Sequence, residues 1–450
     1  MTSRTPSLRP RRARRLLAAT AALAAATTGV GIASSPAQAS GGAPGDFYGR
    51  AFDQCTAPSQ SAMTAWMNSS PYRGVGIYLS GDSRGCTSQP NLTSTWIRTQ
   101  IAAGWHLLPI TLGPQASCTT RERYLKQVRI NPSTTSTYAA ARAQGTAEAK
   151  KTVSRATALG IPKGSTMFYD LEAFDTGRST ACTESAKYFV SAWSTQLRAT
   201  GWKSGFYSSG ASGIRMLDDA RVRTPGKFAM PDQLWIADWN GQATTSSAYV
   251  RSDGWTPHKR IHQFQGGHNE TYAGVTINID SNHADLGRGA YLTAEPAHPG
   301  GIGWAANTYI ALNEKATNTG QIRLLQSMLS SAGYYKGAVD GVWTRPLSAA
   351  VGTFRKEHGL AGTWDWTSTQ WMQLMTRGAT PVVKYGSAGD EVRRVQRALN
   401  ASGVSRKIPI SGVFTVSTPA AVQDYQRKVG ISPSGVVNAT TWAALTRGRR

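Results

Sequence analysis

Two carboxylates stand two residues apart at the end of an apolar run. Asp170 and Glu172 follow residues 166–169, whose apolar and aromatic side chains predict a buried strand. Because side chains alternate along a strand, both carboxylates would point to the same side, roughly 6.5 Å apart. Two acids at this spacing repel each other, so one of them should have a raised pKa. We expect Asp170 to be the ionised member of the pair and Glu172 the protonated one. A protonated acid beside an ionised one is the arrangement that glycoside hydrolysis uses.

The same spacing would fit two unrelated acids at a solvated strand end, so the surrounding chain has to decide between the two interpretations. Eight short apolar runs have the character of strands, and helical patterns separate the early ones. They cover residues 48–53, 74–79, 106–112, 168–172, 204–208, 233–239, 260–265 and 275–280. Repeated strand–helix units over about 250 residues predict an α/β fold, a (β/α)8 TIM-like barrel with one or two incomplete units near its end.

Acidic residues gather at the ends of these predicted strands. Five of them lie at or near the last residue of a run: Asp53, Asp170, Glu172, Asp238 and Asp280. In such a barrel the carboxyl ends of the strands form one mouth, where active sites lie. Loop-capping acids would explain one or two of the five, but all five on one mouth predict a functional site. Tryptophans could stack on sugars there, although buried tryptophans are equally common. The candidates are Trp105, Trp235, Trp239 and Trp255.

The first 39 residues have the composition of an export signal. They contain six arginines and no acid, an apolar segment at 16–26, and the small-residue cleavage site Ala37-Gln38-Ala39. The apolar segment is too short to be a stable membrane anchor. The paired arginines resemble a twin-arginine signal, and a general secretory signal fits nearly as well. We therefore predict a signal peptide at 1–39 and no membrane segment after its removal.

The chain is strongly basic. Its net charge is +24, and +18 remains once the six arginines of the signal are removed. This excess predicts an acidic partner, which could be nucleic acid, anionic lipid or an anionic cell wall. The export signal argues against nucleic acid, so we expect anionic cell-wall polymers.

Four cysteines follow the signal: Cys55, Cys86, Cys118 and Cys182. An even number in an exported protein predicts two disulfides. Three pairings are possible, and chain order favours Cys55–Cys86 with Cys118–Cys182. The cysteines have no zinc-ligand spacing, and His262, His268 and His283 match no ligand motif. We therefore predict neither a metal nor a cofactor.

The last third of the chain is a repeat. A linker rich in Gly and Pro covers residues 294–303. Beyond it, matching residues recur with an offset of 71: Phe354 with Tyr425, Gly359 with Gly430, and Trp371 with Trp442. Each repeat predicts three short amphipathic helices, over 304–378 and 382–448. Residues 303–450 carry a net charge of +11.

The repeats resemble the three-helix peptidoglycan-binding domain family. The shared pattern is L-Q-x-x-L, then D/S-G-V-W/F, then A-A-V-x-x-F/Y and a late Trp. The first repeat lacks the Gly-x-x-Gly entry that Gly386 and Gly389 supply in the second, which has Ser411 where the first has Asp340. The resemblance implies that peptidoglycan is the partner.

Residues 46–292 resemble the domain family of unknown function numbered 1906, a glycoside-hydrolase-like barrel similar to the family 25 lysozymes. The matching residues are Phe52-Asp53, Gln144-Gly145, Tyr169-Asp170, Glu172, Trp235, Ala237-Asp238-Trp239, Gln263-Phe264 and Ile279-Asp280. The resemblance implies a barrel domain over 40–293, with Glu172 as general acid and Asp53, Asp170 and Asp238 as the other members of the catalytic group. We expect substrate binding by Tyr207, Trp235, Trp239, Gln263 and Asp280.

Two functions remain open from these observations. The leading hypothesis is a secreted, cell-wall-associated glycoside hydrolase, a monomer that cleaves peptidoglycan like a lysozyme and is held on the wall by its repeats. The alternative is a non-catalytic protein whose barrel binds glycan without cleaving it. The acid group favours the first hypothesis.

Overall fold

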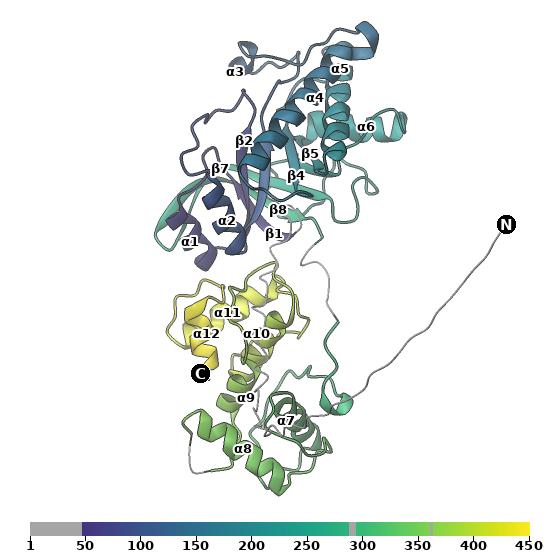
Figure 1. Ribbon diagram of the computed structural model, residues 1–450. Helices are drawn as coiled ribbons and strands as arrows, with labels where there is room; N and C mark the ends of the chain where they lie inside the picture. Colours follow the sequence, from purple (N-terminus) through teal and green to yellow (C-terminus); the bar gives the residue numbers. More distant parts are fainter. Residues whose placement is uncertain (1–46, 288–293, 361–362) are drawn as a thin grey trace, which may run out of the picture. The chain divides into compact units, whose positions relative to one another are not determined.

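The computed structural model describes residues 47–287, 294–360 and 363–450 (Figure 1). The predicted signal at 1–39 lies outside the described residues. Both predicted disulfides are present, joining Cys55 to Cys86 and Cys118 to Cys182. None of the helices in the described ranges has the length and apolar character needed to cross a membrane.

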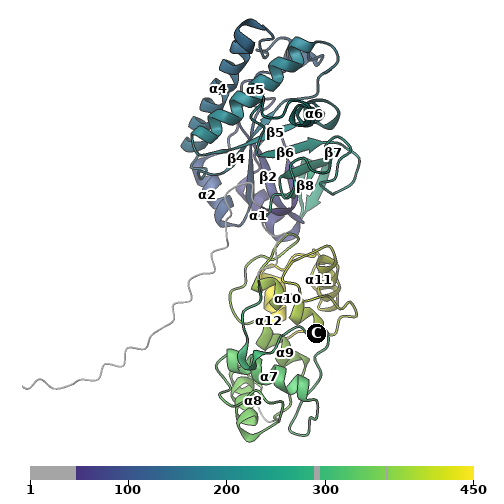
Figure 2. The same cartoon turned by 90° about the vertical axis from the view of Figure 1, so that its right-hand side faces the viewer.

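Eight strands close into a barrel, which confirms the predicted fold class (Figures 1 and 2). Neighbouring strands from β1 to β7 run parallel, whereas β8 is antiparallel to both β7 and β1. The antiparallel hairpin of β7 and β8 explains why the last predicted units lacked helices. The strands are β1 Tyr48–Asp53, β2 Tyr72–Ser80, β3 His106–Thr111, β4 Thr166–Asp170, β5 Lys203–Ser209, β6 Gln233–Ala237, β7 Arg260–Tyr272 and β8 Val275–Asp285.

Helices cover the outside of the barrel. They are α1 Gln60–Ser69, α2 Ser94–Ala102, α3 Glu122–Leu125, α4 Thr135–Ala158, α5 Thr180–Ala199 and α6 Arg215–Arg223. The two longest, α4 and α5, lie side by side (Figures 1 and 2). Gly145 allows this close approach, because a Cβ added there would lie 2.2 Å from the backbone oxygen of Phe189.

Strand alternation divides the apolar side chains between two cores. On β4, Tyr169 points outward against Phe189 and Trp193 of α5, and Phe168 points into the barrel against Trp235. Asp170 follows Phe168 by two residues, so it also points into the barrel. The sequence of β4 thus places an acid directly above the interior core.

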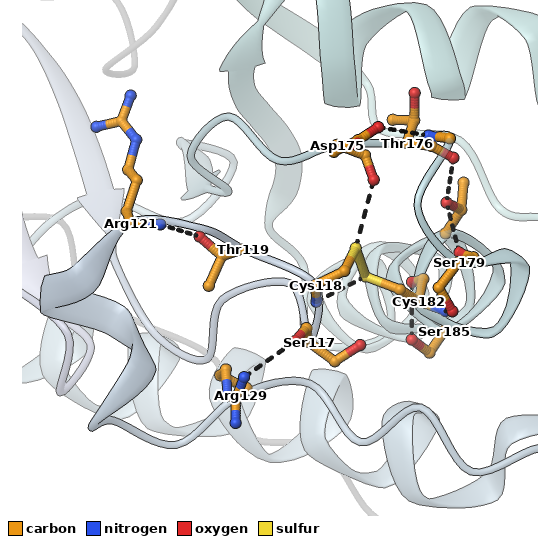
Figure 3. Close-up of a disulfide and its surroundings, with 12 residues drawn as sticks. Ser117, Cys118, Thr119, Arg121, Arg129, Asp175, Thr176, Ser179, Cys182 and Ser185 are labelled. Carbon is orange, nitrogen blue, oxygen red and sulfur yellow. Dashed lines mark hydrogen bonds between the residues drawn. A yellow bond between two sulfur atoms is a disulfide. The ribbon is translucent and has the colours of Figure 1, made fainter.

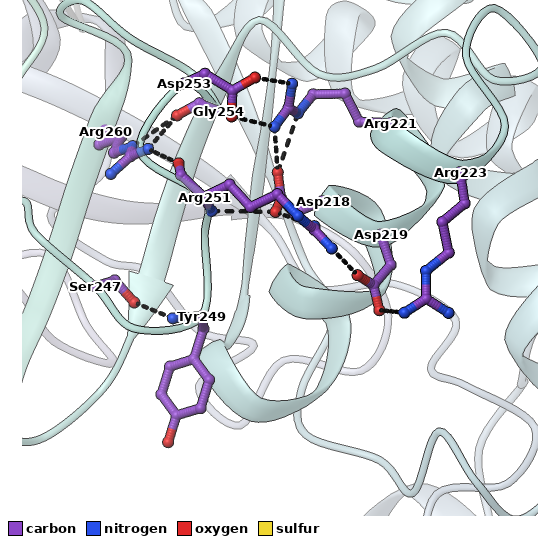
Figure 4. A network of polar contacts seen from close by, with 10 residues as sticks. All are labelled: Asp218, Asp219, Arg221, Arg223, Ser247, Tyr249, Arg251, Asp253, Gly254 and Arg260. Atoms are coloured by element: carbon purple, nitrogen blue, oxygen red, sulfur yellow. Dashed lines mark hydrogen bonds and ion pairs between the residues drawn. The ribbon is translucent and has the colours of Figure 1, made fainter.

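The segment between β6 and β7 is fastened to α6 by charged side chains (Figure 4). Asp218 is buried on α6, and its carboxylate forms ion pairs with Arg221 at 2.8 Å and Arg251 at 2.6 Å. Arg221 also pairs with Asp253 at 2.9 Å. Hydrogen bonds from both arginines hold the pKa of Asp218 below its usual range despite burial. This network is a structural support for a long loop.

The C-terminal part consists of two sets of three helices, as the repeats predicted. The first set is α7 Thr319–Ser331, α8 Arg345–Glu357 and α9 Ser368–Met375; the second is α10 Asp390–Ala401, α11 Ser417–Lys428 and α12 Ala439–Thr446. Their apolar faces form a core of their own, which includes Leu325, Trp371, Leu399 and Trp442.

The repeated Gln and Gly residues have a structural role. Gln326 donates to Asp340 at 2.8 Å and accepts from the backbone N–H of Gly341. In the second repeat Gln396 donates to Ser411 at 3.1 Å and accepts from Gly412. Ser411 therefore replaces Asp340 in the same turn, so this departure between the repeats preserves the local structure.

Candidate active site

Four of the predicted acids lie at the carboxyl ends of parallel strands or on their antiparallel neighbour. Asp53 is the last residue of β1, Asp170 is the last residue of β4, and Asp238 directly follows β6. Asp280 lies on β8, where it is paired in register with Asp53. Because β1, β4 and β6 run in the same direction, the three strand ends open at one mouth.

Asp53 is held by amides at the bottom of this mouth. Its Oδ1 accepts from Asn282 at 2.6 Å and from Gln263 at 3.1 Å. Burial, followed by the charge of Asp280, raises the pKa of Asp53 from its ordinary value of 3.8 to about 8. Asp53 therefore keeps a proton near neutral pH.

Gly76 makes room for Asp53, and Gln263 links Asp53 to Asp280. A Cβ added at Gly76 of β2 would lie 2.4 Å from the Cβ of Asp53, so the adjacent strand needs a glycine there. Gln263 of β7 donates from Nε2 to both Asp53 and Asp280, and its Oε1 accepts from Tyr207 at 3.0 Å. Burial also raises the pKa of Asp280.

Asp170 is fully buried, with only one hydrogen-bonded side chain on its carboxyl group among the described residues. Tyr78 donates to Oδ2 at 3.2 Å, and Oδ1 has no partner in the described ranges. Burial, followed by the charge of Glu172, raises the pKa of Asp170 well above its usual range. From the sequence we expected Asp170 to be the ionised member of the pair; the structure differs, because complete burial disfavours its charge.

Glu172 lies beyond the strand end and is 22 % exposed. Its Oε2 is 3.2 Å from Arg121 Nη1, and its Oε1 accepts from Tyr124 at 3.4 Å. The side chain of Gln115 fixes the backbone on both sides, accepting from the N–H of Glu172 and donating to the carbonyl oxygen of Asp170. Arg121, Tyr124 and Gln115 together therefore position Glu172.

The acids open onto a cavity of about 220 Å³. Asp53, Glu172 and Asp280 line it, whereas Asp170 lies behind its wall. The other lining residues are Gln54, Cys55, Tyr78, Arg84, Gly85, Cys86, Leu112, Arg123, Asn278 and Ile279. Both carboxyl groups and two arginines thus line the same cavity. In the described ranges, no three His, Cys, Asp or Glu side chains gather closely enough to hold a metal ion.

The remaining predicted site residues are divided between the mouth and the core. Asp238 accepts from Asn240 in its own loop and does not line the cavity. Trp239 is 66 % exposed, and its Nε1 donates to Gln263 at 3.0 Å.

Trp235 is completely buried inside the barrel and donates to Asn282. The expectation that Trp235 stacks on a sugar is therefore wrong, because its ring already packs on Phe168. Trp105 and Trp255 are also buried.

The two disulfides hold the loops that carry this site. Cys55 follows Asp53 closely and is joined to Cys86 on the loop after β2. Cys118 is joined to Cys182 of α5, and Arg121 lies three residues further along the same segment (Figure 3). This second bridge therefore fixes the segment from which Arg121 and Tyr124 reach Glu172.

Several site residues were not foreseen from the sequence. Arg121, Arg123 and Tyr124 come from the segment between β3 and α4, and Arg84 comes from the loop after β2. These segments have no hydrophobic periodicity, so no pattern placed their side chains. The even cysteine count was the one usable signal, because it implied that these loops are tied to the barrel.

Both parts of the chain match models of known domain families. Residues 64–284 match the model of the Rv2525c-like, glycoside hydrolase-like domain. Residues 318–371 and 388–445 each match the putative peptidoglycan binding domain. An uncharacterized protein of Kitasatospora aureofaciens is 35 % identical over 65 residues, which is 14 % of this chain; the chain spans 55 % of that protein's length.

Solved structures similar to this chain cover about half of it. An uncharacterized B. stearothermophilus protein is 20 % identical, with 52 % of this chain and 95 % of that chain covered and a TM-score of 0.33. The Tat-secreted protein Rv2525c of Mycobacterium tuberculosis is 12 % identical, with the same coverage and a TM-score of 0.34. A family 25 glycosyl hydrolase from Bacillus anthracis is 12 % identical over 53 % of this chain and 89 % of its own, with a TM-score of 0.32.

Proposed function

The chain contains an Rv2525c-like, glycoside hydrolase-like domain followed by two peptidoglycan-binding domains, and we propose that it hydrolyses glycosidic bonds of peptidoglycan. The observation that supports this proposal most directly is the cavity at the barrel mouth, which Asp53, Glu172 and Asp280 line. Glycoside hydrolysis needs one carboxyl group that gives a proton and another that carries charge. The three carboxyl groups of this cavity can supply such a pair.

Glu172 is the proton donor in this proposal. It is partly exposed in the cavity, so a glycosidic oxygen can reach it, whereas Asp170 is completely buried and does not line the cavity. Asp280 is also partly exposed, but Gln263 and the backbone N–H of Gly267 donate to its two oxygens. The charges of these acids influence one another: Glu172 raises the pKa of both Asp53 and Asp170. Asp53 and Asp170, whose pKa values are raised, can therefore hold a proton beside Glu172.

The other predicted residues position the sugar. Gln263 connects Asp53, Asp280 and Tyr207, so it fixes the polar floor on which the substrate lies. The exposed ring of Trp239 is the stacking surface for a neighbouring sugar. Asp238 has a supporting role in the loop that carries this ring, because its carboxylate accepts from Asn240.

A non-catalytic glycan-binding barrel is the second candidate, and one observation favours it. Arg121 Nη1 contacts Glu172 Oε2, and this contact occupies an oxygen that an acid catalyst would use. A hydrolase has to break or weaken that pair when the substrate enters. A binding protein would keep it.

Secretion and attachment to the cell wall complete the proposal. Two disulfides favour an oxidising compartment outside the cytoplasm. The basic repeats, with a net charge of +11, favour retention on an anionic wall. The proposed limits are a signal at 1–39, the barrel at 40–293, a linker at 294–303 and wall-binding repeats at 304–378 and 382–448.

Product analysis distinguishes hydrolysis from binding. The mature chain is incubated with purified peptidoglycan, and newly formed reducing ends are measured. Glu172→Gln keeps the shape of the side chain and removes its transferable proton, so we expect at least about 100-fold slower release. Glu122→Gln, at an exposed glutamate of α3, is the matched control and should leave the rate unchanged. Equal rates for wild type and Glu172→Gln would reject Glu172 as the acid. No release from any peptidoglycan, together with glycan binding, would favour the second candidate.

A further inference from the structure

Two arginines share the cavity with the acids, although neither was foreseen as a site residue. Arg84 lies on the loop after β2 and Arg123 on α3, and both line the cavity together with Asp53, Glu172 and Asp280. Hydrolysis of a neutral glycoside by carboxyl groups needs neither cation. Their presence therefore requires a separate explanation.

Backbone oxygens hold both guanidinium groups. Arg84 donates from Nε to the carbonyl oxygen of Gly81 at 2.8 Å and from Nη1 to that of Tyr78 at 3.2 Å. Arg123 donates from Nη2 to the carbonyl oxygen of Ser83 at 2.9 Å. The two side chains are thus fixed by neutral acceptors, two of them on the short loop of residues 81–86 and one on β2.

Neither guanidinium forms an ion pair with a carboxylate. Within the described ranges, no Asp or Glu oxygen lies within 4.0 Å of Arg84 or Arg123. Burial, followed by the charge of Arg155, lowers the pKa of Arg84, and the carboxylate of Asp82, which itself pairs with Lys151, opposes this shift only in part. Among described protein groups, Arg84 Nη2 and Arg123 Nη1 have no acceptor. These donors are available to a ligand.

The loop is built to keep the arginines at the cavity. Gly85 lies beneath Arg123: a Cβ there would be 3.3 Å from Nη2 and 3.5 Å from Nη1 of that guanidinium. The disulfide between Cys55 and Cys86 joins the loop to the strand end that carries Asp53. The positions of the two arginines and of Asp53 are therefore coupled covalently.

We propose that Arg84 and Arg123 form an anion subsite, and that the cavity takes a saccharide with a carboxylate next to the sugar that the acids contact. This inference rests on the proposed function and narrows its substrate class to acidic glycans. Guanidinium groups suit this ligand because their paired N–H donors match the two oxygens of a carboxylate. In peptidoglycan the carboxylate has two sources, the lactyl group of an unsubstituted muramic acid and the attached peptide.

Three monosaccharide probes test the subsite without being consumed, because none contains a bond between two sugars. They are N-acetylmuramic acid, its neutral methylamide, and N-acetylmuramyl-L-alanyl-D-isoglutamine. NMR titration of the mature chain at low salt gives a Kd for each. We expect the acid or the dipeptide to bind about tenfold more tightly than the methylamide, the effect of one charge-assisted contact. The better of the two acidic probes identifies the source of the carboxylate.

Variants show whether the preference comes from these arginines. Arg123→Gln and Arg84→Gln should each abolish most of it while binding of the methylamide is kept. Arg123→Lys should retain part of it, because the charge remains and the paired donors are lost. Arg98→Gln, at an exposed arginine of α2, has the same charge change and should have no effect. All four variants leave the repeats unchanged, so any binding of a probe to the repeats is the same in wild type and variants. Thermal unfolding shows that each variant is folded.

The outcomes separate this inference from the proposed function. Equal affinities for all three probes would overturn the anion subsite and leave glycan binding intact. A preference that survives in both Gln variants would also overturn it. If none of the probes binds to the wild type, both the subsite and the proposed role of the cavity fail.

Discussion

Arg121 Nη1 lies 3.2 Å from Glu172 Oε2, so the proposed proton donor is paired with a cation from a neighbouring loop. The arginine is 49 % exposed and the glutamate 22 %, so solvent screens the pair and its contribution is modest. The contact nevertheless occupies an oxygen of the proposed acid, so it bears on catalysis more than on the stability of the fold.

Removing this arginine should free the proposed acid. In Arg121→Gln the Oε2 atom of Glu172 loses its ion-pair partner, so the side chain can reach a glycosidic oxygen without first breaking that contact. We expect kcat/KM for peptidoglycan to rise by up to about fivefold, the effect of one exposed ion pair. Arg98→Gln serves as the control for a general change of charge. An unchanged or lower kcat/KM would show that this ion pair does not restrain the acid.

Asp53 should make the fold less stable as pH rises. Its pKa is about 8 in the folded protein and near 3.8 when unperturbed, so between these values the folded state binds more protons than the unfolded state. Its stabilising contribution is complete below pH 4 and is lost as pH rises towards 8. Burial of Asp170 acts in the same direction.

Asp53→Asn should therefore flatten the pH dependence of stability. We expect the variant to lose less free energy of unfolding than the wild type between pH 5 and 8, by roughly 1 kcal/mol or more. Denaturant titrations at several pH values measure this difference. Asp365→Asn, at an exposed aspartate of the repeats, is the control. An identical pH slope for wild type and Asp53→Asn would show that Asp53 titrates normally.

The strands and their terminal acids were predictable because both depend on short-range patterns. The run before Asp170 is apolar over successive residues, and alternation fixes the direction of its side chains. The protonation state of Asp170 was not predictable in the same way. It depends on burial, and Asp170 is completely buried, whereas Glu172, two residues later, is outside the strand.

Residue type alone did not separate the tryptophans. Trp235 and Trp239 lie four residues apart, yet the first is inside the barrel and the second is exposed at its mouth. The strand β6 ends between them, at Ala237, so alternation no longer applies to Trp239. The contacts of Arg121 and Tyr124 with Glu172 could not be predicted from the sequence either. Both residues lie on an irregular loop, and only the folding of that loop brings them to Glu172.

The repeats should bind the wall without the barrel. Their helices have a separate apolar core and a net charge of +11, so we expect a fragment of residues 303–450 to fold and to sediment with insoluble peptidoglycan. Salt should weaken this binding several-fold between 0.05 and 0.5 M, because screening shortens the range of charge attraction from more than 10 Å to a few Å.

A barrel fragment, residues 40–293, is the control and should remain largely in solution. Equal sedimentation of the barrel fragment and the full chain would show that the repeats are not the anchor. Binding of 303–450 that does not respond to salt would instead assign recognition to neutral contacts, and the charge of the repeats would need another explanation.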